Sequence, residues 1–456
     1  MLSTSLVAVD STIVATAVPS IVDNLGEFDR FPWLFSVYLL AQAVSVPIYG
    51  KLADLVGRKP VILFGIGLFL LGSVLCGTAW SMVSLILFRA VQGLGAGAVQ
   101  PMALTIAGDV YTLEERGKVQ GYLASVWGVS AIVGPAVGGV FAEYVGWRWI
   151  FFVNVPLCLI AATMLIRTFH EKVNRRTHNL DLAGAVLLTA GCSLLILGLL
   201  EGGNAWAWRS LPGIGVPVAG LVLIAVFIQV ERTAIEPVLP LWTFRRRVLV
   251  TCSLVGVGLG AVLIGLTSFV PTFAQGVLGA GPLVAGFALA MMSLGWPLTA
   301  AQSSRLYLRI GFRSTALIGS VAVVTGTVLC ALSGPGSSVL VVGGACFLVG
   351  AGLGFVAAPT LIAAQSTVAW AERGVVTAAN LFSRSVGSAI GVAIFGAIAN
   401  ASVGPGTATP ASLAQASQHV FIAVAVAAIL MTIAVAAMPR PRAATDGRVE
   451  PAERAA

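Results

Sequence analysis

Three charged side chains stand inside long apolar runs, where their types could bind protons or counter-charges. Asp10 is the one carboxylate placed within such a run rather than at its end, and Arg89 and Arg384 are the two cations so placed. A charge inside a membrane-spanning helix is costly and therefore marks a functional site by default. Burial favours the neutral form of a carboxyl group. We therefore predict that Asp10 binds and releases a proton in each working cycle.

Arg89 is the predicted partner of Asp10, because a guanidinium inside a membrane needs a counter-charge and the sequence offers one acid there. Gln92 follows Arg89 by three positions and so shares its helix face. We expect Asp10 and Arg89 to form a proton-coupling pair whose contact changes when Asp10 is protonated. A permanent structural ion pair is the alternative. Because only nine residues precede Asp10, a position nearer to cytoplasmic water is a second alternative.

A further set of polar residues is predicted to line a substrate pathway. The set is Gln92, Gln275, Asn380 and Arg384, with Gln302 and Gln365 as additional polar positions. Arg384 stands ten residues from the expected cytoplasmic end of its helix. A role in the substrate site and snorkelling of the guanidinium to the inner interface therefore both remain open.

Composition places these residues in an integral membrane protein. Hydrophobic residues make up 58% of the chain, charged residues 10%, and the mean hydropathy is +0.97, whereas a soluble chain is nearer 25% charged. The six cysteines all fall in apolar runs without a CxxC pair, which indicates core residues rather than disulfides or metal ligands. A phosphate-binding loop, zinc-ligand spacing and a Ser/His/Asp arrangement are all missing, so we expect neither an enzyme nor a cofactor.

The apolar runs are long enough to cross a bilayer and divide into fourteen predicted helices. Their ranges are 2–23, 33–52, 60–79, 82–108, 118–141, 149–167, 182–200, 213–230, 248–274, 282–303, 314–333, 338–363, 374–400 and 418–438. With the basic turn 50–60 in the cytoplasm, 21 of the 26 Lys and Arg residues fall on that side and three fall outside. We predict a multi-pass protein of the cytoplasmic (inner) membrane with both termini cytoplasmic. The net charge of +8 then reflects topology and contact with anionic lipids, not nucleic-acid binding.

Three stretches resemble signatures of the major facilitator superfamily. GKLADLVGRKP (50–60) resembles the loop signature G-x-L-x-D-x-x-G-R-[KR] between helices two and three. AVDSTIVATAVPSI (8–21) is similar to the helix-one signature of the fourteen-helix drug:proton antiporter branch. SAIVGPAVGG (130–139) is similar to the antiporter signature G-x-x-x-G-P-x-x-G-G, with Ser130 in place of the first glycine. The chain is identified as a member of that branch, the EmrB/QacA-like multidrug efflux transporters.

The resemblance implies roles for two groups of residues. A conformational latch would consist of Gly50, Asp54, Gly57, Arg58 and Lys59, with Arg58 or Arg116 as the basic partner of Asp54. The antiporter helix would carry Gly134, Pro135, Gly138 and Gly139. Small residues there allow close helix packing, and a proline removes one backbone hydrogen bond and kinks the helix.

The resemblance also implies an all-α membrane fold of two pseudo-symmetric six-helix bundles plus two extra central helices. We expect the first bundle over 1–167, a cytoplasmic linker with the two extra transmembrane helices over 168–236, the second bundle over 237–438 and a disordered cytoplasmic tail over 439–456. An internal offset of 254 residues aligns Gly57 with Gly311, and one of 257 aligns Gly134 with Gly391. Paired halves of this kind hold a substrate site between them.

The predicted function is proton-coupled efflux of hydrophobic drugs or amphiphilic small molecules by alternating access. With one acid and two arginines inside the spans, we expect neutral, zwitterionic or anionic substrates rather than dications. A proton symporter for uptake, or a lipid-handling membrane protein without coupled transport, are the alternatives. The expected partners are the substrate, protons and membrane lipids, and we expect the chain to act as a monomer.

Overall fold

The computed structural model describes residues 1–26, 33–171, 181–202, 206–207, 209–234, 237–403 and 410–439. The first part contains α1 (Leu2–Leu25), α2 (Trp33–Val56), α3 (Arg58–Gly77), α4 (Met82–Val110), α5 (Leu113–Val140), η2 (Phe141–Val145), α6 (Trp149–Phe152) and α7 (Asn154–Thr168). Next come α8 (Leu182–Glu201), α9 (Leu211–Glu231) and η3 (Leu241–Phe244). The last part contains α10 (Arg247–Gly276), α11 (Pro282–Ile310), α12 (Phe312–Leu332), α13 (Val339–Ser366), η4 (Trp370–Glu372), α14 (Arg373–Val403) and α15 (Pro410–Ala436). In these ranges the chain is all-helical, with one isolated bridge between Gly202 and Trp206.

Eleven helices of the described residues are long and apolar enough to cross a membrane, which confirms a multi-pass membrane protein. Helices α1 and α8 contribute only the shorter apolar stretches Leu2–Val14 and Ala183–Leu199, and α5 is not among the eleven. The fourteen spans expected from the sequence therefore stay a prediction. The predicted cytoplasmic tail lies, apart from residue 439, outside the described residues.

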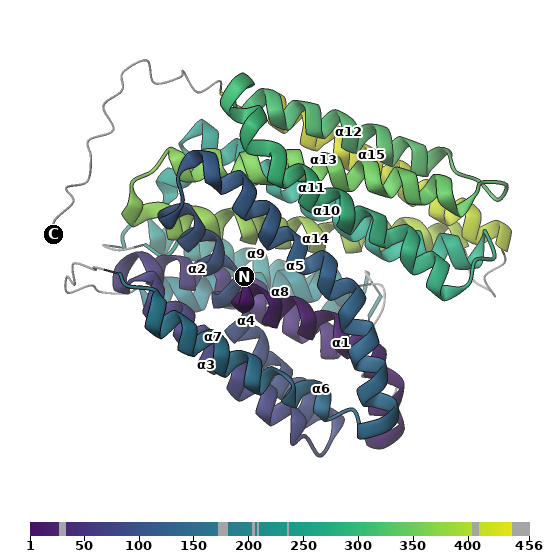
Figure 1. Ribbon diagram of the computed structural model, residues 1–456, viewed down its shortest axis with the longest axis horizontal. Coiled ribbons are helices and arrows are strands. Elements are labelled where there is room, and N and C mark those ends of the chain that lie inside the picture. The colour runs from purple at the N-terminus through teal and green to yellow at the C-terminus, as the bar shows by residue number, and fades with distance from the viewer. Residues whose placement is uncertain are drawn as a thin grey trace.

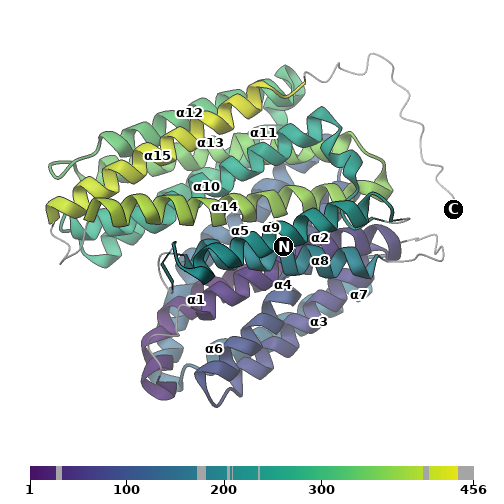
Figure 2. The same cartoon turned by 180° about the vertical axis from the view of Figure 1, so that it is seen from behind.

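Two groups of helices make up most of the molecule (Figure 1). Helices α1–α7 pack around apolar clusters that include Phe69, Met102 and Phe151, and α10–α15 pack around clusters that include Leu353 and Phe421. The groups meet at the end where α2, α4 and α13 finish and α3, α5 and α14 begin; we call this the Asp54 end. Figures 1 and 2 both show the groups diverging toward the opposite end.

Two helix pairs make the most extensive contacts between the groups: α2 lies against α14, and α5 lies against α11. Close packing of α5 on α11 depends on Gly117, where an added Cβ would stand 2.6 Å from Cβ of Ser304. Helices α8 and α9 pack on each other, and α8 also lies against α2 and α14. Helix α8 therefore covers the contact between the two groups on one side.

The internal offsets place matching glycines at matching points of the two groups. Gly57 joins α2 to α3 with φ 100°, and Gly311 joins α11 to α12 with φ 84°. L-residues with a side chain avoid such positive φ angles, so glycine suits both turns. Gly134 of α5 packs on α1, and Gly391 of α14 packs on α10. The two groups therefore repeat the same local packing.

Gly260 of α10 is expected to be intolerant of even one methyl group. An added Cβ would clash with the Arg384 carbonyl and approach the Ser388 nitrogen to 2.8 Å. We expect Gly260→Ala to destabilise the protein by about 1–3 kcal/mol, because α10 and α14 must separate. Gly286→Ala is the matched control, since its Cβ meets nothing within 4 Å and a helical Gly→Ala change favours the helix. A lower Tm in nanodiscs for Gly260→Ala alone is the expected result, and equal Tm values would contradict it.

Candidate functional site

A buried polar cluster surrounds Asp10 inside the first helix group. One carboxylate oxygen of Asp10 accepts a hydrogen bond from Arg89 Nη1 at 2.6 Å. The other accepts from Gln92 Nε2 at 2.8 Å and from Asn154 Nδ2 at 2.9 Å. Asp10 and Arg89 are each 1% exposed. The structure therefore brings together the two residues of the predicted proton-coupling pair, while their role in coupling stays a prediction.

Neighbouring polar groups hold the cluster in place. Arg89 Nε donates to the Leu34 carbonyl at 3.2 Å, and its guanidinium lies 4.1 Å from the ring centroid of Tyr38. Ser73 Oγ accepts from Gln92 at 2.6 Å and from Asn154 at 3.1 Å. A buried charge is tolerated where its hydrogen-bonding capacity is satisfied in this way. The cluster is built from residues of α1, α2, α3, α4 and α7.

Sequence reasoning missed Asn154, Ser73 and Tyr38. A signal was present for Asn154, which is a lone amide between apolar runs in FFVNVP. Ser73 had no such signal, because small hydroxyl residues are common in apolar helices. Gln92 was expected along the substrate pathway, but the structure places its fully buried amide against Asp10. The side chain at position 92 shares the face of Arg89, and that face points into the first helix group.

Asp10 does not lie near the Asp54 end, and its distance from cytoplasmic water stays a prediction. Its partner Arg89 is seven residues from the start of α4 and twenty-one from its end at Val110. At about 1.5 Å per residue, these intervals correspond to roughly 10 Å and roughly 30 Å. The cluster is therefore displaced toward the end at which α4 begins.

Asn154→Ala is expected to destabilise the folded protein. The substitution removes one donor from the Asp10 carboxylate and one from Ser73, both of which stay buried. A hydrogen bond to a charged group contributes about 1.5–3 kcal/mol. Gln229→Ala is the matched control, because the Gln229 amide oxygen accepts from Arg232 on the exposed surface. Thermal unfolding in nanodiscs should show a lower Tm for Asn154→Ala alone; a Tm equal to that of wild type would count against the expected role.

Helix α1 is tied to α5 two residues beyond Asp10. Thr12 Oγ1 donates to the Ser130 carbonyl at 2.9 Å. An added Cβ at Gly134 would clash with the Thr12 hydroxyl and stand 2.8 Å from Thr12 Cβ. At Gly139 nothing lies within 4 Å of the added Cβ. Of the predicted antiporter-helix glycines, Gly134 thus makes the close approach to α1, whereas Gly139 does not pack on another helix.

Two other predicted residues of that helix lie nearby. Gly138 is buried, and the backbone at Pro135 is helical within α5. The role of Gly134, Pro135, Gly138 and Gly139 in antiport stays a prediction.

At the Asp54 end, a carboxylate of one helix group binds the first turn of a helix in the other. The two oxygens of Asp54 accept hydrogen bonds from the backbone nitrogens of Gly374 at 2.9 Å and Val375 at 2.8 Å. These nitrogens belong to the start of α14, where unpaired N–H groups and the helix dipole favour an anion. Gly50 permits the approach, because an added Cβ would stand 2.8 Å from the Gly374 carbonyl.

Arg58 connects both groups at the same end. It pairs with Asp54 at 3.0 Å and with Asp109 at 3.1 Å. Its Nη2 donates to the Trp370 carbonyl at 2.5 Å, and the guanidinium lies 3.7 Å from the Trp370 ring centroid. Arg373 of α14 reaches back to Asp109 at 2.9 Å. The hydrogen bonds described between the two groups all lie at this end of the molecule.

The remaining latch residues behave differently from one another. Arg116 was the alternative partner for Asp54, but its Nε donates to the Tyr111 carbonyl at 3.1 Å instead. Lys59 contacts its own helix group, with Nζ donating to the Ile166 carbonyl at 2.9 Å. Gly57 forms the turn described above. Gly50, Asp54 and Arg58 thus lie at the contact between the two groups, and the role of the five residues as a latch stays a prediction.

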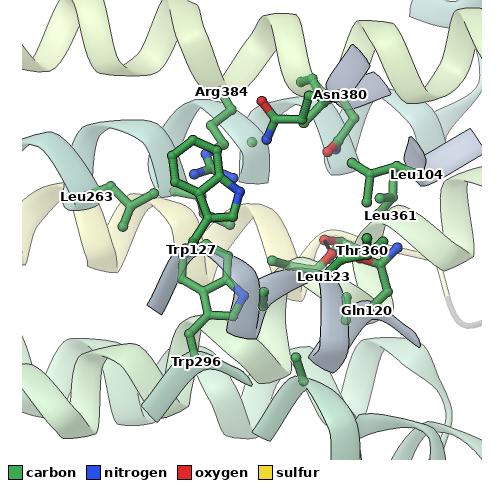
Figure 3. A pocket seen from close by; sticks show the side chains of 18 of the residues that line it. Leu104, Gln120, Leu123, Trp127, Leu263, Trp296, Thr360, Leu361, Asn380 and Arg384 are labelled. Atoms are coloured by element: carbon green, nitrogen blue, oxygen red, sulfur yellow. Dashed lines mark hydrogen bonds between the residues drawn. The ribbon is translucent and has the colours of Figure 1, made fainter. Parts of the chain in front are cut away.

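A cavity of about 250 Å³ lies between the two groups (Figure 3). The first group lines it through α1, α4 and α5, and the second through α10, α11, α13 and α14. Its polar and aromatic lining residues are Thr4, Gln100, Gln120, Trp127, Thr267, Ser293, Trp296, Thr360, Asn380 and Arg384. Asp10 and Arg89 are not among the lining residues, so the buried cluster and the cavity are separate sites.

Two of the four predicted pathway residues line the cavity, namely Asn380 and Arg384. Arg384 therefore faces the cavity. Gln275 lies exposed near the far end of α10 and outside the cavity lining. Gln365 closes the Asp54 end instead, with Nε2 donating to the Leu104 carbonyl at 3.4 Å.

The family profile described as Major Facilitator Superfamily matches residues 1–392. The chain belongs to the Major Facilitator Superfamily. It is 36% identical over 391 residues to "Multidrug resistance protein 3" of Bacillus subtilis, covering 86% of this chain and 76% of that protein. It is 35% identical over 397 residues to "Multidrug transporter protein MdtP" of the same organism, covering 87% and 73%. The printed names of these two relatives refer to multidrug resistance and to multidrug transport.

Solved structures of the Major Facilitator Superfamily share the fold. The human organic anion transporter MFSD10 (TETRAN) superposes with a TM-score of 0.68 at 14% identity, covering 95% of this chain and 97% of that one. The proton:xylose symporter XylE superposes with a TM-score of 0.64 at 13% identity, covering 93% and 92%. At such identities the likeness supports the all-helical major facilitator fold alone.

Proposed function

We propose that this protein exports hydrophobic or amphiphilic small molecules in exchange for protons, by alternating access. The observation that carries the proposal is the buried Asp10 carboxylate, held by Arg89, Gln92 and Asn154. A carboxylate inside a membrane protein is a default proton site. The multidrug names of its relatives suggest the class of substrate.

Coupling between proton and substrate would pass through α1 and α5. Protonation of Asp10 removes the charge that Arg89 binds and so weakens their contact. Helix α1 carries both Asp10 and the cavity-lining Thr4, and it is tied to α5 through Thr12. Helix α5 carries Trp127 of the cavity wall. A shift of α1 on protonation would therefore reach the cavity through packed helices rather than through direct contact with the substrate.

Alternating access would use the closure at the Asp54 end. We propose that this end faces the cytoplasm, since the basic turn and most cationic loops lie there. The closure by Asp54 and Arg58 then corresponds to a state sealed from the cytoplasm. Opening requires α14 to leave the Asp54 carboxylate. We retain the latch role of Gly50, Asp54, Gly57, Arg58 and Lys59 as part of this proposal.

We further propose that the chain has fourteen spans, as in the drug:proton antiporter branch. Helices α1, α5 and α8 would add three spans to the eleven found by length and composition. The bundles would then be residues 1–167 and 237–438, with α8 and α9 as the extra central pair. The protein would act as a monomer in the cytoplasmic membrane, in contact with its lipids.

Transport in inside-out vesicles tests the function. Two radiolabelled probes are offered: chloramphenicol, a neutral amphiphile, and naphthalene-2-sulfonate, an amphiphile that is anionic at any working pH. An acidic interior supplies about 2.3 kcal/mol per 100 mV and about 1.4 kcal/mol per pH unit for each proton that leaves. We expect uptake that stops when an ionophore collapses the gradient. Uptake that continues unchanged in the presence of the ionophore would contradict proton coupling. Accumulation of the probes only in right-side-out vesicles would indicate symport.

A further inference from the structure

Among the described residues that line the cavity, Arg384 alone is charged. Within the described residues, no carboxylate and no hydrogen-bond acceptor contacts its guanidinium; its one described partner is the Trp296 ring, at 5.3 Å from the centroid. Arg89, which also lies inside a candidate span, has a carboxylate at 2.6 Å. A guanidinium with five donors and no acceptor in a membrane interior is an incomplete arrangement. It lacks an anion.

The backbone holds Arg384 firmly at this place. Gly256 and Gly260 let α10 approach α14 so closely that side chains there would meet the backbone of Asn380 and Arg384. Ser388 Oγ donates to the Gly260 carbonyl at 3.1 Å one turn further on. The guanidinium is therefore presented to the cavity by a rigid pair of helices, and its cation–π contact with Trp296 limits its rotation.

The surroundings of Arg384 suit an aromatic ring carrying a negative group. Figure 3 shows Trp127 and Trp296 at the Arg384 end of the cavity, whereas Gln120, Thr360 and Leu361 lie toward the other end. Indole rings stack on planar aromatic groups. The guanidinium fork matches the oxygens of a carboxylate or sulfonate, to which charge-assisted hydrogen bonds are about twice as strong as neutral ones.

We propose that Arg384 is an anion-binding residue of the cavity, and that the preferred ligands are planar aromatic monoanions. This inference rests on the proposed function for its meaning, because it names the substrate class of that cavity. The inference also predicts that the cavity prefers organic anions to organic cations. The same lone positive charge, with no carboxylate in the lining, disfavours organic cations.

Binding to the purified full chain tests the inference without a proton gradient. Naphthalene-2-sulfonate and naphthalene-2-sulfonamide have nearly the same shape and differ by one charge. Isothermal titration calorimetry in phosphatidylcholine nanodiscs measures the affinity ratio of the two. For wild type we expect the sulfonate to bind at least about tenfold more tightly. Arg384→Gln should bring the ratio to about one, and Arg384→Lys should keep a preference for the sulfonate because the charge remains.

Arg209→Gln is the matched control, since Arg209 lies exposed and away from the cavity; its ratio should equal that of wild type. A wild-type ratio near one, or a preference that survives in Arg384→Gln, would overturn the inference. If Arg384→Gln fails to fold, the affinity ratios of wild type and Arg384→Lys still test the inference, because both are expected to favour the sulfonate. If the protein binds the sulfonate selectively but shows no gradient-driven uptake, the proposed function is rejected and this inference stands. If it shows gradient-driven uptake but no preference for the sulfonate, this inference is rejected and the proposed function stands.

Discussion

Asp10→Asn is expected to reduce proton-driven uptake in inside-out vesicles to the level of vesicles without the protein. Asparagine keeps the shape of the side chain but cannot take up and release a proton near neutral pH. Each pH unit across the membrane corresponds to about a tenfold limiting accumulation for one proton exchanged. The accumulation ratio of the variant should therefore fall to about one at any imposed gradient, for chloramphenicol and naphthalene-2-sulfonate alike.

Asp23→Asn is the matched control, because Asp23 belongs to the same helix α1 but is exposed. It should accumulate both probes as wild type does. Asp10→Asn leaves the Arg89 guanidinium buried without a carboxylate. The Tm of Asp10→Asn and its amount in the membrane must therefore be measured alongside transport. A second readout is exchange of labelled for unlabelled probe without a gradient, which should persist. Gradient-driven uptake by a folded Asp10→Asn protein would place the proton site elsewhere.

Asp54→Ala is expected to open the Asp54 end. The variant removes the acceptor for two backbone N–H groups of α14 and one partner of Arg58. Hydrogen bonds to charged groups contribute about 1.5–3 kcal/mol each. A loss of even 1.4 kcal/mol from the closed state alone changes its ratio to the open state tenfold. We therefore expect the population open at this end to rise by about tenfold or more.

Thiol labelling measures that opening. A cysteine placed at Gln120 in the cavity is offered a membrane-impermeant maleimide from the Asp54 end, and the rate is compared with and without Asp54→Ala. The six native cysteines are all buried and provide the background. Glu114→Gln, an exposed carboxylate in the first turn of α5, is the matched control and should leave the rate unchanged.

An independent variant approaches the same closure from α14. At Gly374 an added Cβ would stand 2.5 Å from the Gly50 carbonyl and 2.6 Å from the Asp54 carboxylate, so Gly374→Val should separate the helices and raise the labelling rate as well. If neither Asp54→Ala nor Gly374→Val alters labelling in folded protein, the contacts at the Asp54 end do not control access.

Local sequence patterns determined the class of this protein. Apolar runs of bilayer length report helices directly, because in a membrane the backbone must satisfy its own hydrogen bonds. For the same reason a rare charge stands out, and Asp10, Arg89 and Arg384 could each be singled out without a structure. Gly57 and Gly311 were also detectable, since the repeat in the sequence places both at equivalent helix junctions.

Only the tertiary structure decided what these residues contact. Asn154 reaches Asp10 across 144 positions of sequence, and Asp54 reaches Gly374 across 320. Asp54 binds the start of α14 and Arg58 rather than Arg116, because helix ends from both groups converge there. Gln92 and Arg384 both looked like pathway residues, yet one faces the inside of a helix group and the other faces the cavity. Hydropathy reports that a helix spans the membrane, whereas the direction of each side chain depends on how the helices rotate and pack against one another.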